Sequence, residues 1–166
     1  MNQTHLILVC FALCVIAVLP AQAFEAKSLT ITLAENGDAE IDMQYELTFL
    51  EQSAVFLRIA DPAAELKKAF DSNSGKPVTV TRATSSSAVV LVPSFARVYA
   101  GNGKKTIVTP AVSFERAQDV MNGYWFAPLI SPDFSPAVST VVFPDGHRAT
   151  FHDVISLPPI SRSVTQ

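Results

Sequence analysis

The residues with the clearest potential for chemistry lie close together near the C-terminal end of the chain: Asp145, His147, His152 and Asp153. Two imidazoles and two carboxylates are ligands that divalent metals accept. However, His147 and His152 are five positions apart, so on one strand their side chains point to opposite faces. Asp145 also has a structural role in the Pro144-Asp145-Gly146 turn. The pattern indicates solvated or locally hydrogen-bonded side chains, and we predict no metal site and no cofactor.

Nucleophilic catalysis has equally little support in the sequence. The serines at 85–87 and Ser94 lack the Gly-x-Ser-x-Gly elbow of α/β-hydrolases. Cys10 and Cys14 lie in the N-terminal apolar run, so cysteine catalysis is excluded once that run is removed. Because catalytic triads assemble in space, a hydrolase site built from scattered residues stays an alternative. The two histidines and Asp153 are its first candidates.

Two other polar groups have simple structural explanations. Glu40, Asp42 and Glu46 could serve as paired catalytic carboxylates or calcium ligands, but they alternate with apolar residues. That alternation is typical of the solvent-facing side of a strand. The segment at 101–105, Gly-x-Gly-Lys-Lys, is too short for a phosphate-binding loop and lacks the helix that follows one. We interpret it as a solvated turn.

Three consecutive aromatic residues, Tyr124, Trp125 and Phe126, precede a proline-rich stretch at 128–136. In an extended segment they cannot all point the same way, so at least one reaches the surface or packs under the loop. Exposed aromatic side chains can bind a protein partner or stack on a sugar. We predict them as candidate partner-binding residues, with core or loop packing as the alternative. Open sheet edges are a second predicted binding route, because they present unpaired backbone amides.

The charge balance argues against nucleic-acid binding. The chain has 12 basic and 15 acidic residues, a net charge of -3, and no long block of one sign. The densest basic spot is Lys104-Lys105, whereas binding to a phosphate backbone needs a patch of several cations. Because 49% of the residues are hydrophobic, the chain can build a packed core, which argues against disorder.

The N-terminal segment has the pattern of an export signal. An uncharged apolar run from Leu6 to Leu19 is followed by small residues, with Ala21 and Ala23 two positions apart before Phe24. We therefore predict residues 1–23 as a signal peptide cleaved after Ala23. No later apolar run reaches the length of about 20 residues that crosses a bilayer. An uncleaved N-terminal anchor is the alternative, and we expect membrane contact only in that case.

Alternating apolar and polar residues predict two strands between Ser28 and Phe49. Asn36-Gly37 tolerates positive φ, so these strands should form an antiparallel hairpin. A second clear hairpin is expected from 138–143 and 148–154, around a Pro-Asp-Gly turn. The remaining expected elements are strands at 53–59, 78–83, 88–92 with its continuation at 95–99, and 106–113, and helices at 62–70 and 114–121.

Short strands separated by turn signals predict a mainly β fold: an antiparallel two-layer β-sandwich with one short inserted helix. We expect a single exported domain over residues 24–160, followed by a polar tail at 161–166. The mature chain would contain no cysteine, so its stability is expected from burial and hydrogen bonding rather than from disulfides.

Both ends of this domain carry motifs that resemble a known group. They are Leu29-Thr-Ile-Thr-Leu-x-Glu-Asn-Gly-Asp-Ala-Glu and Val141-Val-Phe-Pro-Asp-Gly-x6-Asp153. On these motifs the chain resembles a largely uncharacterised family of archaeal exported or surface β-domains. The resemblance implies an exported β fold, and it brings no established activity and no catalytic residues.

The sequence therefore predicts a non-enzymatic structural or interaction module of the cell envelope or extracellular space. Its partner is expected to be an envelope or surface protein bound through a sheet edge or loops. The alternatives are the secreted hydrolase described above and an external domain held by the uncleaved anchor.

Overall fold

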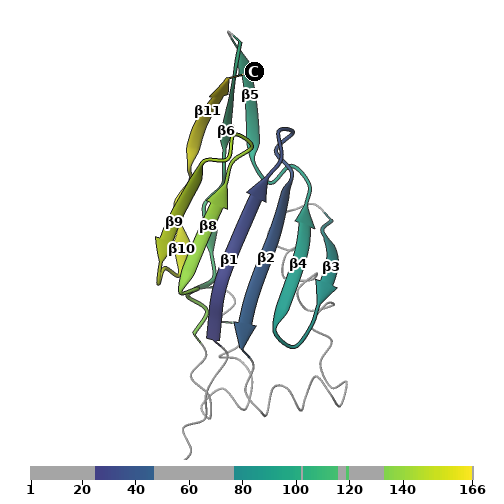
Figure 1. Ribbon diagram of the computed structural model, residues 1–166, viewed down its shortest axis with the longest axis vertical. Helices are drawn as coiled ribbons and strands as arrows, with labels where there is room; N and C mark the ends of the chain where they lie inside the picture. Colours follow the sequence, from purple (N-terminus) through teal and green to yellow (C-terminus); the bar gives the residue numbers. More distant parts are fainter. Residues whose placement is uncertain (1–24, 47–76, 102, 116–118, 120–132, 166) are drawn as a thin grey trace, which may run out of the picture.

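The computed structural model describes residues 25–46, 77–101, 103–115, 119 and 133–165 (Figure 1). Strands make up 61% of this part of the chain, so the prediction of a mainly β fold is confirmed. The same part contains no helix, and therefore none with the length and apolar character to cross a membrane. The strand predicted at 53–59 and the helix predicted at 62–70 lie outside the described residues, as do residues 116–118 and 120–121 of the helix predicted at 114–121.

The strands form three sheets of six, three and two strands. The six-stranded sheet has the order β3-β4-β2-β1-β8-β9, the three-stranded sheet β11-β6-β5, and the two-stranded sheet β10-β7. The bounds are β1 (Glu25–Leu33), β2 (Ala39–Glu46), β3 (Thr79–Ala83), β4 (Ser87–Val92), β5 (Arg97–Gly101), β6 (Lys104–Val108), β7 (Val112–Ser113), β8 (Val138–Val142), β9 (Arg148–His152), β10 (Ser156–Leu157) and β11 (Ser161–Thr165).

The hairpin predicted from 28–49 is confirmed over its described part. β1 and β2 pair antiparallel up to Leu33 and Ala39. Beyond that pair, the Ala34 N–H donates to the Asp38 carbonyl at 2.8 Å. Gly37 closes the turn with a φ of 88°, a left-handed conformation that glycine adopts without steric cost. The period-two pattern thus determined which face of each strand is buried, and the turn residues determined how the two strands pair.

The hairpin predicted from 138–143 and 148–154 is present, and the strands predicted at 78–83 and 88–92 also form a hairpin. β3 pairs antiparallel with β4, and β8 pairs antiparallel with β9 around the Pro-Asp-Gly turn.

Pro110 falls in the break between β6 and β7, which belong to different sheets. The break is expected at a proline because its nitrogen cannot donate a ladder hydrogen bond.

The prediction of a wholly antiparallel arrangement is wrong at one pairing. β1 and β8 are parallel, from Ser28 beside Val138 to Thr32 beside Val142. Parallel neighbours need a long connection rather than a tight turn, and more than 100 residues separate these two strands in the chain. The alternation of apolar and polar residues along a strand shows which face of the strand is buried. It carries no information on whether the neighbouring strands run parallel or antiparallel to it.

Two further segments differ from the expectations. Residues 95–99 do not continue β4, because Ser94 has a φ of 50° and the chain leaves the six-stranded sheet there. The Ser94 N–H donates to the Asp38 carboxylate at 2.6 Å, which holds this exit beside the first hairpin. The segment predicted as a polar tail forms strand β11, which pairs antiparallel with β6. Its polar residues misled the prediction because an edge strand of a small sheet needs few apolar side chains.

The core joins the three sheets. One face of the six-stranded sheet supplies most of it, while β6 adds Ile107 and β10 adds Leu157. Figure 1 shows β5, β6 and β11 extending past one end of the six-stranded sheet. The buried members are Leu29, Ile31, Leu33, Ala39, Ile41, Val78, Val90, Val92, Ala96, Ile107, Val141, Phe143 and Leu157.

Candidate functional site

Strand β9 is a border of the six-stranded sheet, with β8 as its neighbour on one side (Figure 1). All five of its residues pair with β8 without a register shift. A regular edge strand presents a row of N–H and C=O groups to any strand that approaches it. β9 therefore presents such a row of backbone groups at the border of the six-stranded sheet.

The hydrogen bonds flanking β9 show which of its backbone groups face outward. The Phe143 N–H donates to the His147 carbonyl at 2.8 Å, before the strand begins. The Asp153 N–H donates to the Ala137 carbonyl at 3.3 Å, after the strand ends. Because hydrogen-bonded and non-hydrogen-bonded pairs alternate in an antiparallel ladder, the odd-numbered residues of β9 point their backbone groups at β8.

The even-numbered residues Arg148, Thr150 and His152 therefore direct their N–H and C=O groups away from β8. Each of the three residues is exposed to solvent. Within the described part of the chain, no hydrogen bond occupies these outward groups. The open edge thus offers three donors and three acceptors in one line.

The side chains of β9 divide between the two faces of the sheet. Arg148, Thr150 and His152 stand on the outer face, and the half-buried Ala149 and Phe151 stand on the core face. On the outer face, Thr150 is in register with Thr140 of β8, which is in register with Thr30 of β1, so the three threonines form a row.

The opposite border of the sheet, β3, is less regular. Its pairing with β4 shifts register between Val80 and Arg82, where Thr81 Oγ1 donates to the Val89 carbonyl at 3.1 Å. Arg82 also forms an ion pair with Asp42 at 3.3 Å. Bulges and charged side chains are features that protect sheet edges from pairing. β9 has no such bulge.

The borders of the three-stranded sheet are partly engaged by the first and last hairpins. Ahead of β5, the Ala96 N–H donates to the Gly37 carbonyl at 2.8 Å, so the first hairpin lies against the start of this edge. In β11, Arg162 Nε lies 2.7 Å from the Asp145 carboxylate and ties that strand to the turn before β9.

The Asp/His cluster predicted near the C-terminus is divided between the two ends of β9. Asp145 accepts hydrogen bonds from Arg162 and from the His147 N–H, the latter at 3.1 Å. Desolvation works to raise the pKa of Asp145, but these two hydrogen bonds together with the charge attraction to Arg162 and His147 outweigh it and hold the pKa below its ordinary value. The carboxylate therefore has a structural role in the turn.

His147 and His152 do not converge. The His147 ring lies against Phe143, with centroids 6.0 Å apart and planes tilted by 47°. His152 and Asp153 are at the far end of β9, roughly 17 Å along the strand at about 3.4 Å per residue. Among the described residues, no group of three or more His, Cys, Asp or Glu side chains is placed to hold a metal ion.

The other polar groups singled out in the sequence occupy the outer surface. Glu40 and Glu46 are exposed on β2, and Asp42 accepts hydrogen bonds from Gln44 at 2.6 Å and from Arg82. The predicted solvent-facing side of this strand is therefore confirmed.

The turn predicted at 101–105 is shorter than expected, since Lys104 and Lys105 begin β6. Lys105 forms an ion pair with Glu35 of the first hairpin at 3.0 Å, so it is not a free cation for an anionic ligand.

Two sets of predicted functional residues lie outside the part of the chain that the structure describes. They are the aromatic residues Tyr124, Trp125 and Phe126, and the predicted cleavage site at Ala21, Ala23 and Phe24.

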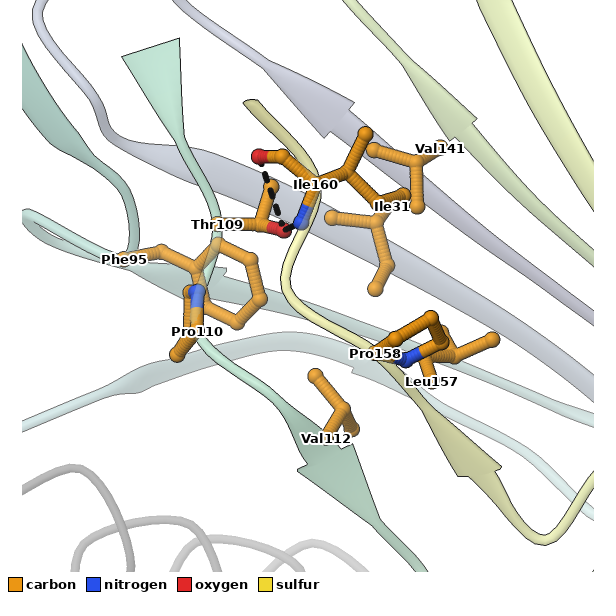
Figure 2. A pocket seen from close by; sticks show the side chains of 9 residues that line it. All are labelled: Ile31, Phe95, Thr109, Pro110, Val112, Val141, Leu157, Pro158 and Ile160. Atoms are coloured by element: carbon orange, nitrogen blue, oxygen red, sulfur yellow. Dashed lines mark hydrogen bonds between the residues drawn. The ribbon is translucent and has the colours of Figure 1, made fainter.

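An apolar hollow lies where β6–β7 and β10–β11 meet the six-stranded sheet (Figure 2). Figure 2 shows a polar link across it, in which the Ile160 N–H donates to Thr109 Oγ1 at 2.9 Å. No position in the hollow is wide enough for a water molecule. It is a packing seam between sheets rather than a ligand site. Its lining comprises Ile31, Phe95, Thr109, Pro110, Val112, Val141, Leu157, Pro158 and Ile160.

The sequence named sheet edges as a binding route without identifying β9. A partial signal was present: Arg148 to His152 contains neither proline nor glycine, and its ionisable side chains, Arg148 and His152, are confined to its ends. That strand composition is compatible with an edge or an interior position, so only the strand order identifies the border.

No protein-family model, curated protein or solved structure matches this chain.

Proposed function

We propose that the protein is a non-enzymatic, exported interaction module of the cell envelope or extracellular space, and that β9 is its binding element. One observation carries the proposal: three consecutive even-numbered residues of a regular border strand are exposed, and their backbone groups point outward. An extended segment of a partner would add to the sheet there by strand addition.

Affinity and specificity have separate sources in this mode of binding. The partner's backbone pairs with the N–H and C=O groups of Arg148, Thr150 and His152. The side chains on the two faces of β9 then select the partner. A polar face carrying Arg148 and His152 and an apolar face carrying Phe151 favour a strand that is itself polar on one side and apolar on the other.

The proposal includes the architecture and location expected from the sequence. The six-stranded sheet forms one layer of a two-layer sandwich, and the smaller sheets contribute to the second. The inserted helix expected at 62–70 stays a prediction, since those residues lie outside the described part of the chain. The buried cluster that joins Ile31 and Val141 to Ile107 and Leu157 supports the two layers. Residues 1–23 direct export, and an uncleaved anchor at this segment is the alternative that leaves the role of β9 unchanged.

Photo-crosslinking in the native cell envelope tests the role of β9. A photoreactive residue at Thr150 of the full chain should form discrete protein adducts after irradiation. The matched control is Thr32, an exposed residue on the same face of the interior strand β1. Equal adduct patterns from the two positions would show that the edge has no special role.

A proline at Thr150 provides a second test, because it removes one outward N–H without altering the hydrogen bonds to β8. The adducts formed from a photoreactive residue at His152 should then decrease. Circular dichroism of each variant establishes that the sheet is intact. Undiminished adducts from a folded Thr150→Pro variant would contradict backbone pairing at β9.

A further inference from the structure

We propose that the strand bound by β9 is the β9 of a second copy of this chain, paired antiparallel about a two-fold axis at Thr150. This inference rests on the proposed role of β9 as a binding edge. This pairing gives a symmetric dimer in which the two six-stranded sheets continue into one another.

The register follows from the positions of the outward backbone groups. With the axis at Thr150, the outward groups of Arg148 meet those of His152 in the second copy, and the groups of the two Thr150 residues meet each other. All three outward residues of each copy are then used. An axis at Arg148 would instead place Pro144 opposite His152, and proline has no N–H to donate.

The side chains are complementary in the same register. The two Thr150 side chains face each other, a cross-strand pairing of hydroxyls that stabilises sheets. They extend the row formed by Thr30 and Thr140 across the axis. On the core face, the large half-buried Phe151 meets the small Ala149 of the second copy, so this face does not bring two bulky groups together.

Charge also favours this pairing over a parallel one. His147 and Arg148 stand at the start of β9, and Asp153 follows its end. In the antiparallel pair, Asp153 of each copy lies opposite His147 of the other copy and next to Arg148, whereas a parallel pair would place the two Arg148 residues side by side. Asp145 at the same turn is already engaged by Arg162, while Asp153 has no ion pair among the described side chains. Asp153 is therefore the acidic group available to the second copy.

Cysteine crosslinking of the full chain tests the register. In a background with Cys10→Ser and Cys14→Ser, a Thr150→Cys variant places two cysteines about 5.5 Å apart between Cα atoms in the dimer. That separation suits a disulfide. The matched control Arg148→Cys places its two cysteines about four residues apart along the strands, roughly 14 Å, beyond the reach of a disulfide.

We expect at least tenfold more disulfide-linked dimer from Thr150→Cys than from Arg148→Cys at equal protein concentration. Mixing Arg148→Cys with His152→Cys should restore crosslinking, because these positions are opposite each other across the axis. Equal dimer formation by the two single variants, or no dimer from Thr150→Cys in a folded protein, would overturn the inference.

The photo-crosslink at Thr150 separates this inference from the proposed function. Adducts between two copies of the chain support both. An adduct with a different protein overturns the second copy as the partner and leaves β9 as a binding edge. Adducts no more abundant than those of the Thr32 control overturn both proposals.

Discussion

The replacement of Gly37 by alanine tests how the first hairpin is joined to the three-stranded sheet. Gly37 has a φ of 88°, and an added Cβ would collide with the Ala96 carbonyl oxygen and lie 3.1 Å from Val98 Cγ2. The Ala96 N–H donates to the Gly37 carbonyl at 2.8 Å, so the two backbones meet directly. The alanine therefore imposes both backbone strain and a displacement of β5 from the hairpin.

The expected loss of stability has three contributions. A left-handed backbone costs a residue with a Cβ about 1–2 kcal/mol. Weakening the hydrogen bond between Ala96 and Gly37 costs about 0.5–1.5 kcal/mol. Reduced freedom of the unfolded chain offsets about 0.4–1 kcal/mol. Gly37→Ala should thus lower the free energy of unfolding by roughly 2 kcal/mol, measured by urea denaturation with the slope m unchanged.

Gly146→Ala is the matched control for this prediction. Gly146 has a φ of 81°, and no heavy atom lies within 4 Å of its added Cβ. It shares the backbone strain of Gly37 and lacks the collision, so its loss should be about 1 kcal/mol smaller. Equal losses at the two positions would refute the inference that Gly37 is required for close contact with Ala96.

Two predictions concern buried hydroxyl groups. Ser139 is fully buried, and its Oγ has no hydrogen-bond partner in the described part of the structure. Ser139→Ala should therefore leave the free energy of unfolding unchanged or raise it by about 1 kcal/mol. A urea titration measures this, and a clear loss of stability would contradict the prediction. Tyr45 donates to the Thr84 carbonyl at 2.7 Å, and Tyr45→Phe should cost about 1 kcal/mol. Burial raises the pKa of Tyr45 above its ordinary value of 10.0. The phenol's contribution to the free energy of unfolding is therefore complete below pH 10 and is lost as the pH rises through the folded-state pKa. In Tyr45→Phe, the decrease in stability at alkaline pH should be smaller.

The sequence by itself determined the hairpins. Alternation placed Leu29, Ile31 and Ile41 on the buried face, and Gly37 marked the turn between their strands. These features are local: the side-chain period of a strand and the φ preferences of turn residues act over a few positions. The same local rules correctly put the Pro-Asp-Gly turn between β8 and β9.

The order and direction of the strands were decided by the tertiary structure alone. Nothing in the local pattern of β1 shows that β8 lies beside it in parallel, or that the polar residues of β11 complete a sheet with β6. These pairings depend on how buried faces from distant segments fit into one core. The exposed border at β9 is a consequence of that order, because a strand becomes an edge only when the positions of all its neighbours are fixed.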